Sequence, residues 1–453
     1  MKLPFTPVFI SILLILNNTG CNIPSSTEEQ LYPLTTVVHP EWSRSATLYE
    51  VNIRQYTPEG TFNAFATHLE RLKELGVDIL WLMPVHPIGI KNRKGPLGSY
   101  YSVKDYRGIN PEFGTLEDFK QLVRQTHQSG MRLIIDWVPN HSSWDNQLVT
   151  EHPEWYAKDS SGQMFSPWDW TDVVQFDYNQ RGLRNYMINA MKYWLTETGI
   201  DGFRCDVAHQ VPVDFWNEVR PALQEVKPDV LLVAEAEQRN LHEHAFDITY
   251  AWEFHHLMNE IAQGHQSVKA IDNYFTRSDT LYNPNDMRMY FTSNHDENSW
   301  NGTVFERLGK AAETMAVLSF TIPGIPLIYN GQEAGLNHRL KFFEKDQIVW
   351  RTHPFEKLYQ RLNQLKEKEA ALWNPGFGGT YTRLATENDS SLLAFIRSKG
   401  NNRVVCLFNL TDQSQNGSLT EIKGNFHDYF SGEHWKSNVF TLEPWGYRVL
   451  VKK

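Results

Sequence analysis

The segment RLIIDWVPNH, residues 132–141, is a nearly continuous apolar run that ends in polar residues. Strands covered on both faces of a parallel sheet have such runs. A second run, VDILWLMP at 77–84, comes before it, and the stretch between the two includes a segment with helical spacing. Thr115 is placed to cap that helix and Gly130 to end it. The order strand, helix, strand is typical of one unit of a parallel α/β fold.

The same alternation continues on both sides of this unit. Eight runs are candidate strands: Thr47–Ile53, Val77–Pro84, Arg132–Val138, Asp201–Asp206, Val230–Glu235, Ala245–Tyr250, Met289–Ser293 and Pro326–Tyr329. Eight strand–helix units predict a (β/α)8 barrel, in which the active site lies at the carboxyl ends of the strands.

Two further regions are predicted around the barrel, which we place at residues 44–375. An aromatic-rich connection after the third strand, residues 141–176, is expected to form a short insertion beside the site. Beyond a helix near 355–367 the pattern changes to short alternating strands with Gly and Asn turns. Residues 376–453 are therefore expected to form a C-terminal antiparallel β-sandwich.

The N-terminus has the layout of an export signal. Lys2 precedes an apolar run at 8–16, which is too short to cross a bilayer as a helix. Gly20-Cys21 resembles the end of a bacterial lipoprotein signal, so residues 1–21 are predicted to be a signal peptide and 22–43 a polar tether. The expected location is outside the cytoplasm, with a membrane anchor on Cys21 in the periplasm or at the cell surface. Cleavage without lipidation, giving a secreted protein, is the alternative.

Charge and cysteine content exclude some classes of partner and bond. The formal net charge is −10, so there is no basic excess to neutralise phosphates, and nucleic acid is not an expected partner. Beyond Cys21 only Cys205 and Cys406 remain, and they fall in different predicted domains. Buried thiols are favoured over a disulfide. The oligomeric state does not follow from the sequence.

Acidic residues recur where the predicted strands end. Asp136, Asp206, Glu235 and Asp296 each follow an apolar run, and carboxylates at the carboxyl ends of barrel strands converge on one pocket. Cleavage of a glycosidic bond requires two facing carboxyls, one ionised and one protonated. Arg204 lies two residues before Asp206, so both side chains point to the same face of the strand. We expect this cation to keep Asp206 ionised.

These residues stand in motifs that resemble the α-amylase superfamily, glycoside hydrolase family 13. The four signatures of that family have counterparts here, in the same order: DWVPNH at 136–141, GFRCD at 202–206, VAE at 233–235 and FTSNHD at 291–296. Supporting matches are YSVKDYRGINPEFGT from Tyr101, FDYN at 176–179 and PGIPLIYNGQE at 323–333.

The resemblance implies a role for each matching residue. Asp206 would be the nucleophile, Glu235 the general acid and base, and Asp296 would hold the distorted sugar ring. Contacts with the substrate are implied for five further residues: Tyr101, His141, Arg204, His209 and His295.

The resemblance also raises the question of a metal ion. Asn140 and Asp177 match calcium ligands of related amylases, with the backbone carbonyl of Gln210 as a third candidate. Oxygen ligands suit Ca²⁺. Family members without calcium use the same residues as hydrogen bonds between barrel and loop, so both alternatives stay open here.

The implied function is hydrolysis of α-1,4-glucosidic bonds in starch-like glucans or maltooligosaccharides. The residue after the nucleophile is Val207 rather than the Lys of many starch amylases. Other activities of the family therefore stay open: cyclomaltodextrinase, neopullulanase, oligo-1,6-glucosidase and glucan transferase. A non-catalytic glucan-binding surface protein is a further alternative, although such relatives usually lack at least one of the three acids. Endo against exo action is not decided by the sequence.

Overall fold

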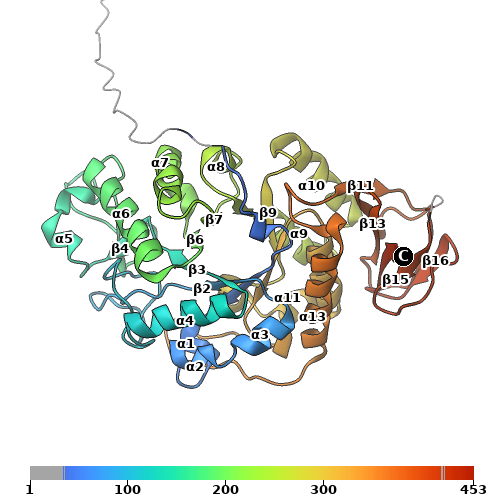
Figure 1. Cartoon of the computed structure of the whole chain (residues 1–453), viewed down its shortest axis with the longest axis horizontal. Coiled ribbons are helices and arrows are strands. Elements are labelled where there is room, and N and C mark those ends of the chain that lie inside the picture. The colour runs from blue at the N-terminus through green and yellow to red at the C-terminus, as the bar shows by residue number, and fades with distance from the viewer. Residues whose placement is uncertain (1–33, 35, 420–421, 423, 453) are drawn as a thin grey trace, which may run out of the picture. The chain divides into compact units, whose positions relative to one another are not determined.

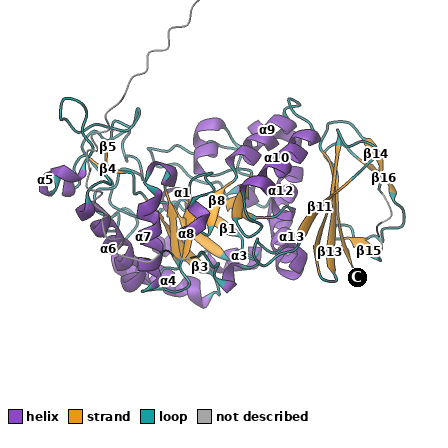
Figure 2. Cartoon of the chain, turned by 90° about the horizontal axis from the view of Figure 1, so that it is seen from above, coloured by secondary structure: helices purple, strands orange, loops and turns teal. Residues whose placement is uncertain are grey.

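The computed structural model describes residues 34, 36–419, 422 and 424–452. Its centre is a closed barrel of eight parallel strands that helices surround (Figures 1 and 2). The barrel strands are β1 Leu48–Val51, β2 Ile79–Leu82, β3 Arg132–Trp137, β6 Gly202–Cys205, β7 Leu231–Ala234, β8 Ile248–Tyr250, β9 Met287–Phe291 and β10 Ile325–Tyr329. The predicted (β/α)8 barrel is confirmed.

Each barrel strand pairs with two neighbours, in the order β1-β10-β9-β8-β7-β6-β3-β2 around the barrel. Each of the eight predicted runs overlaps one of these strands, with different ends. β9 begins two residues before the predicted run and β8 begins three residues after it. The first three residues of the predicted β8 run lie before the strand. Asp247, the last of them, accepts hydrogen bonds from Arg220 and from the backbone N–H of Leu232.

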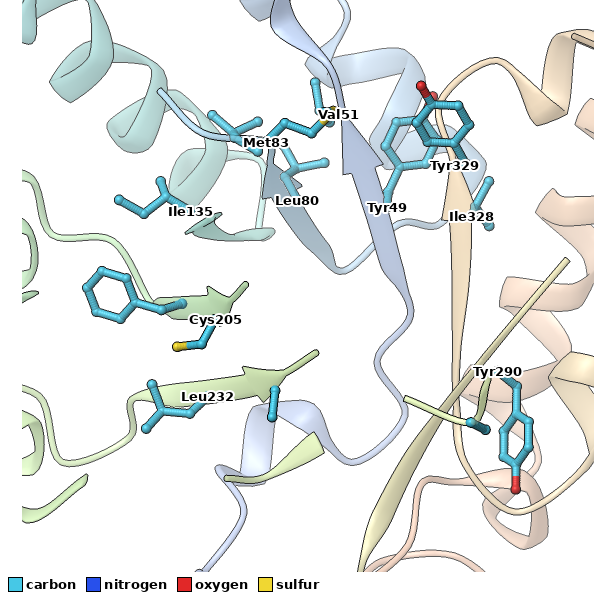
Figure 3. Close-up of a cluster of buried hydrophobic side chains, with 14 of the residues drawn as sticks. Tyr49, Val51, Leu80, Met83, Ile135, Cys205, Leu232, Tyr290, Ile328 and Tyr329 are labelled. Atoms are coloured by element: carbon cyan, nitrogen blue, oxygen red, sulfur yellow. The ribbon is translucent and has the colours of Figure 1, made fainter. Parts of the chain in front are cut away.

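The two-residue period of the strands separates two layers of core. Outward-facing side chains such as Leu80, Cys205, Leu232 and Ile328 pack in the large cluster that lies between barrel and helices (Figure 3). Inward-facing side chains such as Trp81 form a separate cluster inside the barrel. Near the carboxyl ends the inward positions become polar, and these polar positions form the floor of the site: Glu50, Asp136 and Arg204.

Helices follow the barrel strands in chain order. The predicted cap is present: Thr115 and Asp118 form a capping box at the start of α4, and Gly130 follows the helix with a positive φ of 82°. The helices are α1 Ile53–Tyr56, α2 Phe62–Ala66, α3 Leu69–Leu75, α4 Leu116–Gln128, α5 Leu148–Glu151, α6 Arg181–Thr198, α7 Val213–Gln224, α8 Leu241–His244, α9 Trp252–Ala262, α10 Val268–Leu281, α11 Val304–Leu308, α12 Ala312–Thr321 and α13 Pro354–Lys368.

Shorter helical turns mark several connections. They are η1 Glu41–Ser43, η2 Pro153–Trp155, η3 Ala208–Gln210, η4 Glu297–Asn301, η5 Gly309–Ala311, η6 Gln332–Ala334 and η7 Ala370–Leu372. Two of them, η3 and η4, directly follow residues of the site.

The connection after β3 contains its own small sheet. Strands β4 His141–Ser143 and β5 Val173–Gln175 pair antiparallel, with α5 and η2 between them. The chain then returns to the barrel through α6. This is the short insertion expected from the aromatic-rich stretch.

The C-terminal part is all β, as expected. A five-stranded antiparallel sheet and the two-stranded sheet β14–β16 enclose an apolar cluster that includes Leu407 and Leu442. Arg397 binds this part to the barrel, because its Nη1 donates to the carbonyl of Thr321 in α12 at 3.1 Å. The strands are β11 Thr380–Leu384, β12 Leu392–Lys399, β13 Asn402–Asn409, β14 Gln415–Ser418, β15 Phe426–Asp428, β16 Val439–Leu442 and β17 Tyr447–Lys452.

The folded part begins earlier than the sequence indicated. Residues 39–43, assigned above to the tether, pack against the barrel because they find polar partners there. His39 lies 3.0 Å from Asp247, and the indole N–H of Trp42 donates to Asp229. The predicted signal peptide, with Cys21, and the rest of the tether up to residue 33 lie outside the described residues. No helix in the described part of the chain is long and apolar enough to cross a membrane. Cys205 and Cys406 are both buried thiols without a disulfide.

Candidate active site

A cavity of about 500 Å³ lies at the carboxyl ends of the barrel strands. The three carboxylates predicted to carry the chemistry, Asp206, Glu235 and Asp296, all line it. The other lining residues are Lys94, Ser99, Tyr101, His141, Asp169, Trp170, Asp172, Val173, Val207, His295, Trp300, Phe342 and Phe343. The barrel therefore brings together acids that lie up to 90 residues apart in the sequence.

Beneath the cavity one guanidinium group binds three carboxylates. Nη1 of Arg204 lies 2.9 Å from Oδ1 of both Asp136 and Asp206, and Nη2 lies 2.8 Å from Oε2 of Glu235. Nε completes the arrangement by donating to the hydroxyl of Tyr250 at 3.1 Å. Arg204 is fully buried, so its position is fixed by these partners and by packing against Trp81.

A strained turn places Glu235 beside Asp206. Val207, directly after Asp206, has a left-handed φ of 38°, which is costly for a β-branched residue. This turn points its backbone N–H at Oε2 of Glu235, at 2.8 Å. The carboxyl groups of Asp206 and Glu235 are close enough to share a hydrogen bond. Glu235 is thus held by Arg204, by Val207 and by Asp206 itself.

The two facing carboxyls have opposite pKa shifts. Burial and the negative charge of Glu235 raise the pKa of Asp206 well above its usual value. Burial acts on Glu235 in the same direction, but Arg204 and the Val207 N–H outweigh it and hold the pKa of Glu235 below its usual value. Arg204 lowers the pKa of Asp206, as expected, but burial and the charge of Glu235 outweigh this effect, because the one cation is shared among three carboxylates. A proton bound by this pair is therefore shared between the two carboxyls.

Asp296 lies beside a histidine that carries a positive charge. His295 is bound through Nδ1 to the buried Glu50, and its Nε2 lies 3.3 Å from Asp296. Burial alone would lower the pKa of His295, but Asp296 and Glu50 raise it to about 9. His295 Nε2 also lies 2.9 Å from the hydroxyl of Tyr101, which donates to Asp136 at 3.0 Å. The sequence analysis did not identify Glu50 as a residue of the site, although an acidic residue within the apolar run of β1 could have indicated it.

Two groups of aromatic side chains line the cavity beside the carboxylates: one belongs to the aromatic-rich insertion that was expected beside the site, and the other was not predicted. On the side of the insertion, Trp170 packs edge-on against His141, with ring centroids 5.4 Å apart. Burial lowers the pKa of His141 to about 4, so this imidazole is neutral at physiological pH. In the segments after β9 and β10, Phe342 stacks with Tyr101, and Trp300 lies against Phe342. Single aromatic residues in loops carry no periodic signal, which is why sequence reasoning missed Trp300 and Phe342.

Two predicted substrate contacts lie elsewhere. Arg204 does not line the cavity, because the carboxylates cover it; its contacts are with those acids. His209 is exposed on η3 and is not among the lining residues, and its Nδ1 lies 3.4 Å from the backbone oxygen of Glu235. The structure places Tyr101, His141 and His295 in the cavity wall, as the sequence indicated.

The residues proposed as calcium ligands are occupied by other partners. Asn140 exchanges two hydrogen bonds with the side-chain amide of Gln175, at 2.8 and 3.3 Å. Asp177 accepts from the backbone and side chain of Asn179 and from Gln180. Within the described part of the chain, no group of three or more His, Cys, Asp or Glu side chains is placed to hold a metal ion. The contacts of Asn140 with Gln175 are the barrel-to-loop hydrogen bonds of the calcium-free alternative, and the oxygens of Asn140 and Asp177 are also of the kind that Ca²⁺ prefers.

Comparison with known proteins agrees with this architecture. The model of the alpha-amylase catalytic domain matches residues 35–171 and 148–401, and that of the maltogenic amylase C-terminal domain matches residues 381–449. A solved structure described as a noncanonic maltogenic alpha-amylase, from Thermotoga neapolitana, superposes with a TM-score of 0.82 at 30% identity. The alignment covers 90% of this chain and 98% of that one.

Two curated relatives show the range of activities among similar chains. Alpha-amylase 2 of Dictyoglomus thermophilum is 24% identical, over 94% of this chain and 79% of its own length. An alpha-1,4-glucan:maltose-1-phosphate maltosyltransferase of Picrophilus torridus is 26% identical, over 89% of this chain and 68% of its own. Barrel, carboxylate cavity and C-terminal sheets thus agree with the family models across nearly the whole described chain, and we conclude that this protein is an enzyme of the alpha-amylase family, glycoside hydrolase family 13.

Proposed function

We propose that the protein hydrolyses α-1,4-glucosidic bonds in starch-like glucans or maltooligosaccharides with retention of anomeric configuration. One observation carries the proposal: Asp206 and Glu235 contact each other and the same guanidinium, in a cavity that Asp296 also lines. Retaining enzymes have their two carboxyls about 5–5.5 Å apart, whereas inverting enzymes need about 6.5–9.5 Å to admit a water molecule. Two carboxyls in direct contact favour the retaining arrangement.

In the first step Asp206 attacks the anomeric carbon as Glu235 protonates the leaving oxygen. The C–O bond to the leaving glucose breaks, and a bond from Asp206 to the sugar forms. The shared proton must therefore be on Glu235 when the bond breaks. It reaches Glu235 across the contact between the two carboxyls, which leaves Asp206 ionised with Arg204 at 2.9 Å to stabilise its charge.

In the second step Glu235 acts as the base. It removes a proton from a water molecule that attacks the glycosyl–Asp206 ester, and the sugar leaves with its original configuration. The Val207 N–H and Arg204 Nη2, both 2.8 Å from Oε2, stabilise the Glu235 carboxylate between the two steps. Glu235 therefore alternates between acid and base without moving from its partners.

Asp296, His295 and Tyr101 surround the sugar whose bond is broken. The protonated His295 is a donor at this edge of the cavity, and Asp296 offers acceptors for sugar hydroxyls. Hydrogen bonds that strengthen as the ring distorts lower the barrier more than they improve binding. Tyr101 supplies a flat apolar face for the ring.

Three matched variants test the assignment. Asp206→Asn and Glu235→Gln are each expected to reduce kcat on maltoheptaose by about 10⁴-fold, with substrate binding retained. Asp279→Asn is the control, because Asp279 is an exposed carboxylate on α10 that does not line the cavity. Maltosyl fluoride, whose leaving group needs no protonation, should restore glycosylation in Glu235→Gln but not in Asp206→Asn. Full activity in Asp206→Asn would overturn the proposal.

Transfer to a sugar acceptor is the second candidate. The resemblance to a maltosyltransferase favours it, since an acceptor hydroxyl can replace water in the second step. Chromatography of early products from amylose, pullulan and cyclodextrin separates the two. Products longer than the substrate indicate transfer, and faster turnover of cyclodextrin than of starch indicates a cyclomaltodextrinase.

We also propose export and anchoring through Cys21, on the strength of the N-terminal sequence alone. Radioactive palmitate should label the wild-type chain and not Cys21→Ser. Labelling of neither chain would leave export without a lipid anchor.

A further inference from the structure

We infer that the cavity is closed at the end that receives the non-reducing side of the glucan, so that the enzyme acts from chain ends. This inference rests on the proposed function and names its substrate class: free non-reducing ends of α-1,4-glucans. The closure is made by residues 89–99, which follow β2 and which we call the bridge. Lys94 and Ser99 of the bridge line the cavity.

One flank of the bridge is fixed to the loop after β10. The backbone N–H of Leu97 donates to the carbonyl of Phe343 at 3.0 Å. Gly95 lies so close to the same residue that an added Cβ would stand 2.6 Å from the Cβ of Phe343. Gly95 also has a positive φ of 61°, so glycine is required here for two independent reasons.

The other flank is fixed to the insertion after β3. Nζ of Lys94 donates to the backbone oxygen of Asp169 at 3.1 Å and lies 3.6 Å from the buried carboxylate of Asp172. The backbone N–H of Ile90 donates to Asp145 at 3.0 Å. The bridge therefore connects both walls of the cavity and is held to each by polar contacts.

The position of the bridge in the barrel gives the direction of closure. It follows β2, and its anchors follow β10 and β3, which are near neighbours in the order β10-β1-β2-β3 around the barrel. Glu235 follows β7, on the far side of this order. Trp300, Phe342 and Phe343 extend the closed side: the ring centroids of Trp300 and Phe342 lie 5.3 Å apart, and those of Phe342 and Phe343 lie 5.2 Å apart.

The chemistry assigns the two ends of the substrate. Glu235 protonates the leaving oxygen, so the leaving, reducing-side part of the glucan lies toward Glu235. The 4-hydroxyl side of the bound sugar then points away from Glu235, toward the bridge. A chain that continued in that direction would meet Lys94 and Phe343. The space up to the bridge fixes how many glucose units fit, so we expect early products of one short length.

Substrates with a blocked end test this inference. p-Nitrophenyl maltoheptaoside is compared with the same compound carrying a 4,6-ethylidene group on its non-reducing glucose. We expect the block to lower kcat/KM by about 100-fold, because it prevents productive seating. Equal cleavage of the two compounds would support the proposed hydrolysis and would overturn the inference that the cavity is closed at its non-reducing end. Cleavage of neither would overturn the proposed hydrolysis, and the end closure with it.

Two glycine variants attribute the effect to the bridge. Gly95→Ala forces the bridge away from Phe343 and is expected to raise the relative rate on the blocked substrate by about 10-fold. Gly130→Ala is the matched control: its φ is 82°, and an added Cβ meets nothing within 4 Å. It carries the same backbone strain and should keep the wild-type ratio. If Gly95→Ala does not fold, Lys94→Ala removes the opposite anchor and should change the ratio in the same direction. An unchanged ratio in the folded variant would overturn the role of the bridge.

Discussion

The backbone N–H of Val207 donates a 2.8 Å hydrogen bond to Oε2 of Glu235 from a left-handed conformation with φ of 38°. Non-glycine residues in that region store about 1–3 kcal/mol of strain. The strained turn has a function in the site, because it points the backbone N–H of Val207 at the carboxylate of Glu235.

Val207→Gly should therefore stabilise the protein. Glycine adopts this conformation without strain and keeps the N–H, so the free energy of unfolding is expected to rise by about 1 kcal/mol after its larger chain entropy is counted. Urea unfolding of both proteins measures this. Val207→Ala, which keeps a Cβ, should recover less of the strain. A less stable glycine variant would show that packing of the valine side chain outweighs the backbone.

Arg204→Lys should reduce both stability and rate. A lysine carries the same charge but cannot place two nitrogens on Asp206 and Glu235 at once. Leaving buried carboxylates without their partner is expected to lower the free energy of unfolding by about 3 kcal/mol. Thermal unfolding and kcat on maltoheptaose check it. Wild-type stability in this variant would contradict the view that the guanidinium of Arg204 holds Asp136, Asp206 and Glu235 in place.

The pairing of His295 with Asp296 and Glu50 predicts a pH dependence of stability. The pKa of His295 is raised to about 9, above an unfolded value near 6.5. Its contribution to stability is therefore complete below about pH 6.5 and is lost as the pH rises through about 9, with a total near 3 kcal/mol.

The measurement compares the wild type with His295→Asn at pH 6 and pH 10. The difference in unfolding free energy should shrink by about that amount. The double variant Glu50→Gln with His295→Asn removes the neighbouring charge as well and should behave like the single variant between these two pH values. A difference that stays constant with pH would mean that folding does not raise the pKa of His295.

Chelation should leave the melting temperature unchanged. The oxygens of Asn140 and Asp177 accept hydrogen bonds from Gln175, Asn179 and Gln180, and an ion would have to displace those donors. Differential scanning calorimetry with and without EDTA checks this. A fall in melting temperature that added Ca²⁺ reverses would show that these residues rearrange around a metal.

The barrel was predictable because its signals are periodic and local. Apolar runs locate strands, and Thr115 and Gly130 delimit a helix through their backbone preferences. The acids could be predicted too, since strand ends of a closed barrel converge wherever they lie in the chain. The start of the folded part could not, because His39 and Trp42 acquire partners only in three dimensions.

The electrostatics and the walls of the site were not accessible to sequence reasoning. The effect of Arg204 on Asp206 depends on how many other carboxylates share the cation, and that number follows only from packing. The bridge is likewise invisible, because its anchors at Asp169 and Phe343 are backbone groups whose chemistry is independent of residue type.

The retaining role of Asp206 and Glu235 is tested most directly by the configuration of the newly released sugar. Proton NMR of the first products from maltoheptaose, recorded before mutarotation, should show the α-anomer at the new reducing end. Initial appearance of the β-anomer would contradict the account, because a single displacement by water would then have to replace the covalent step on Asp206.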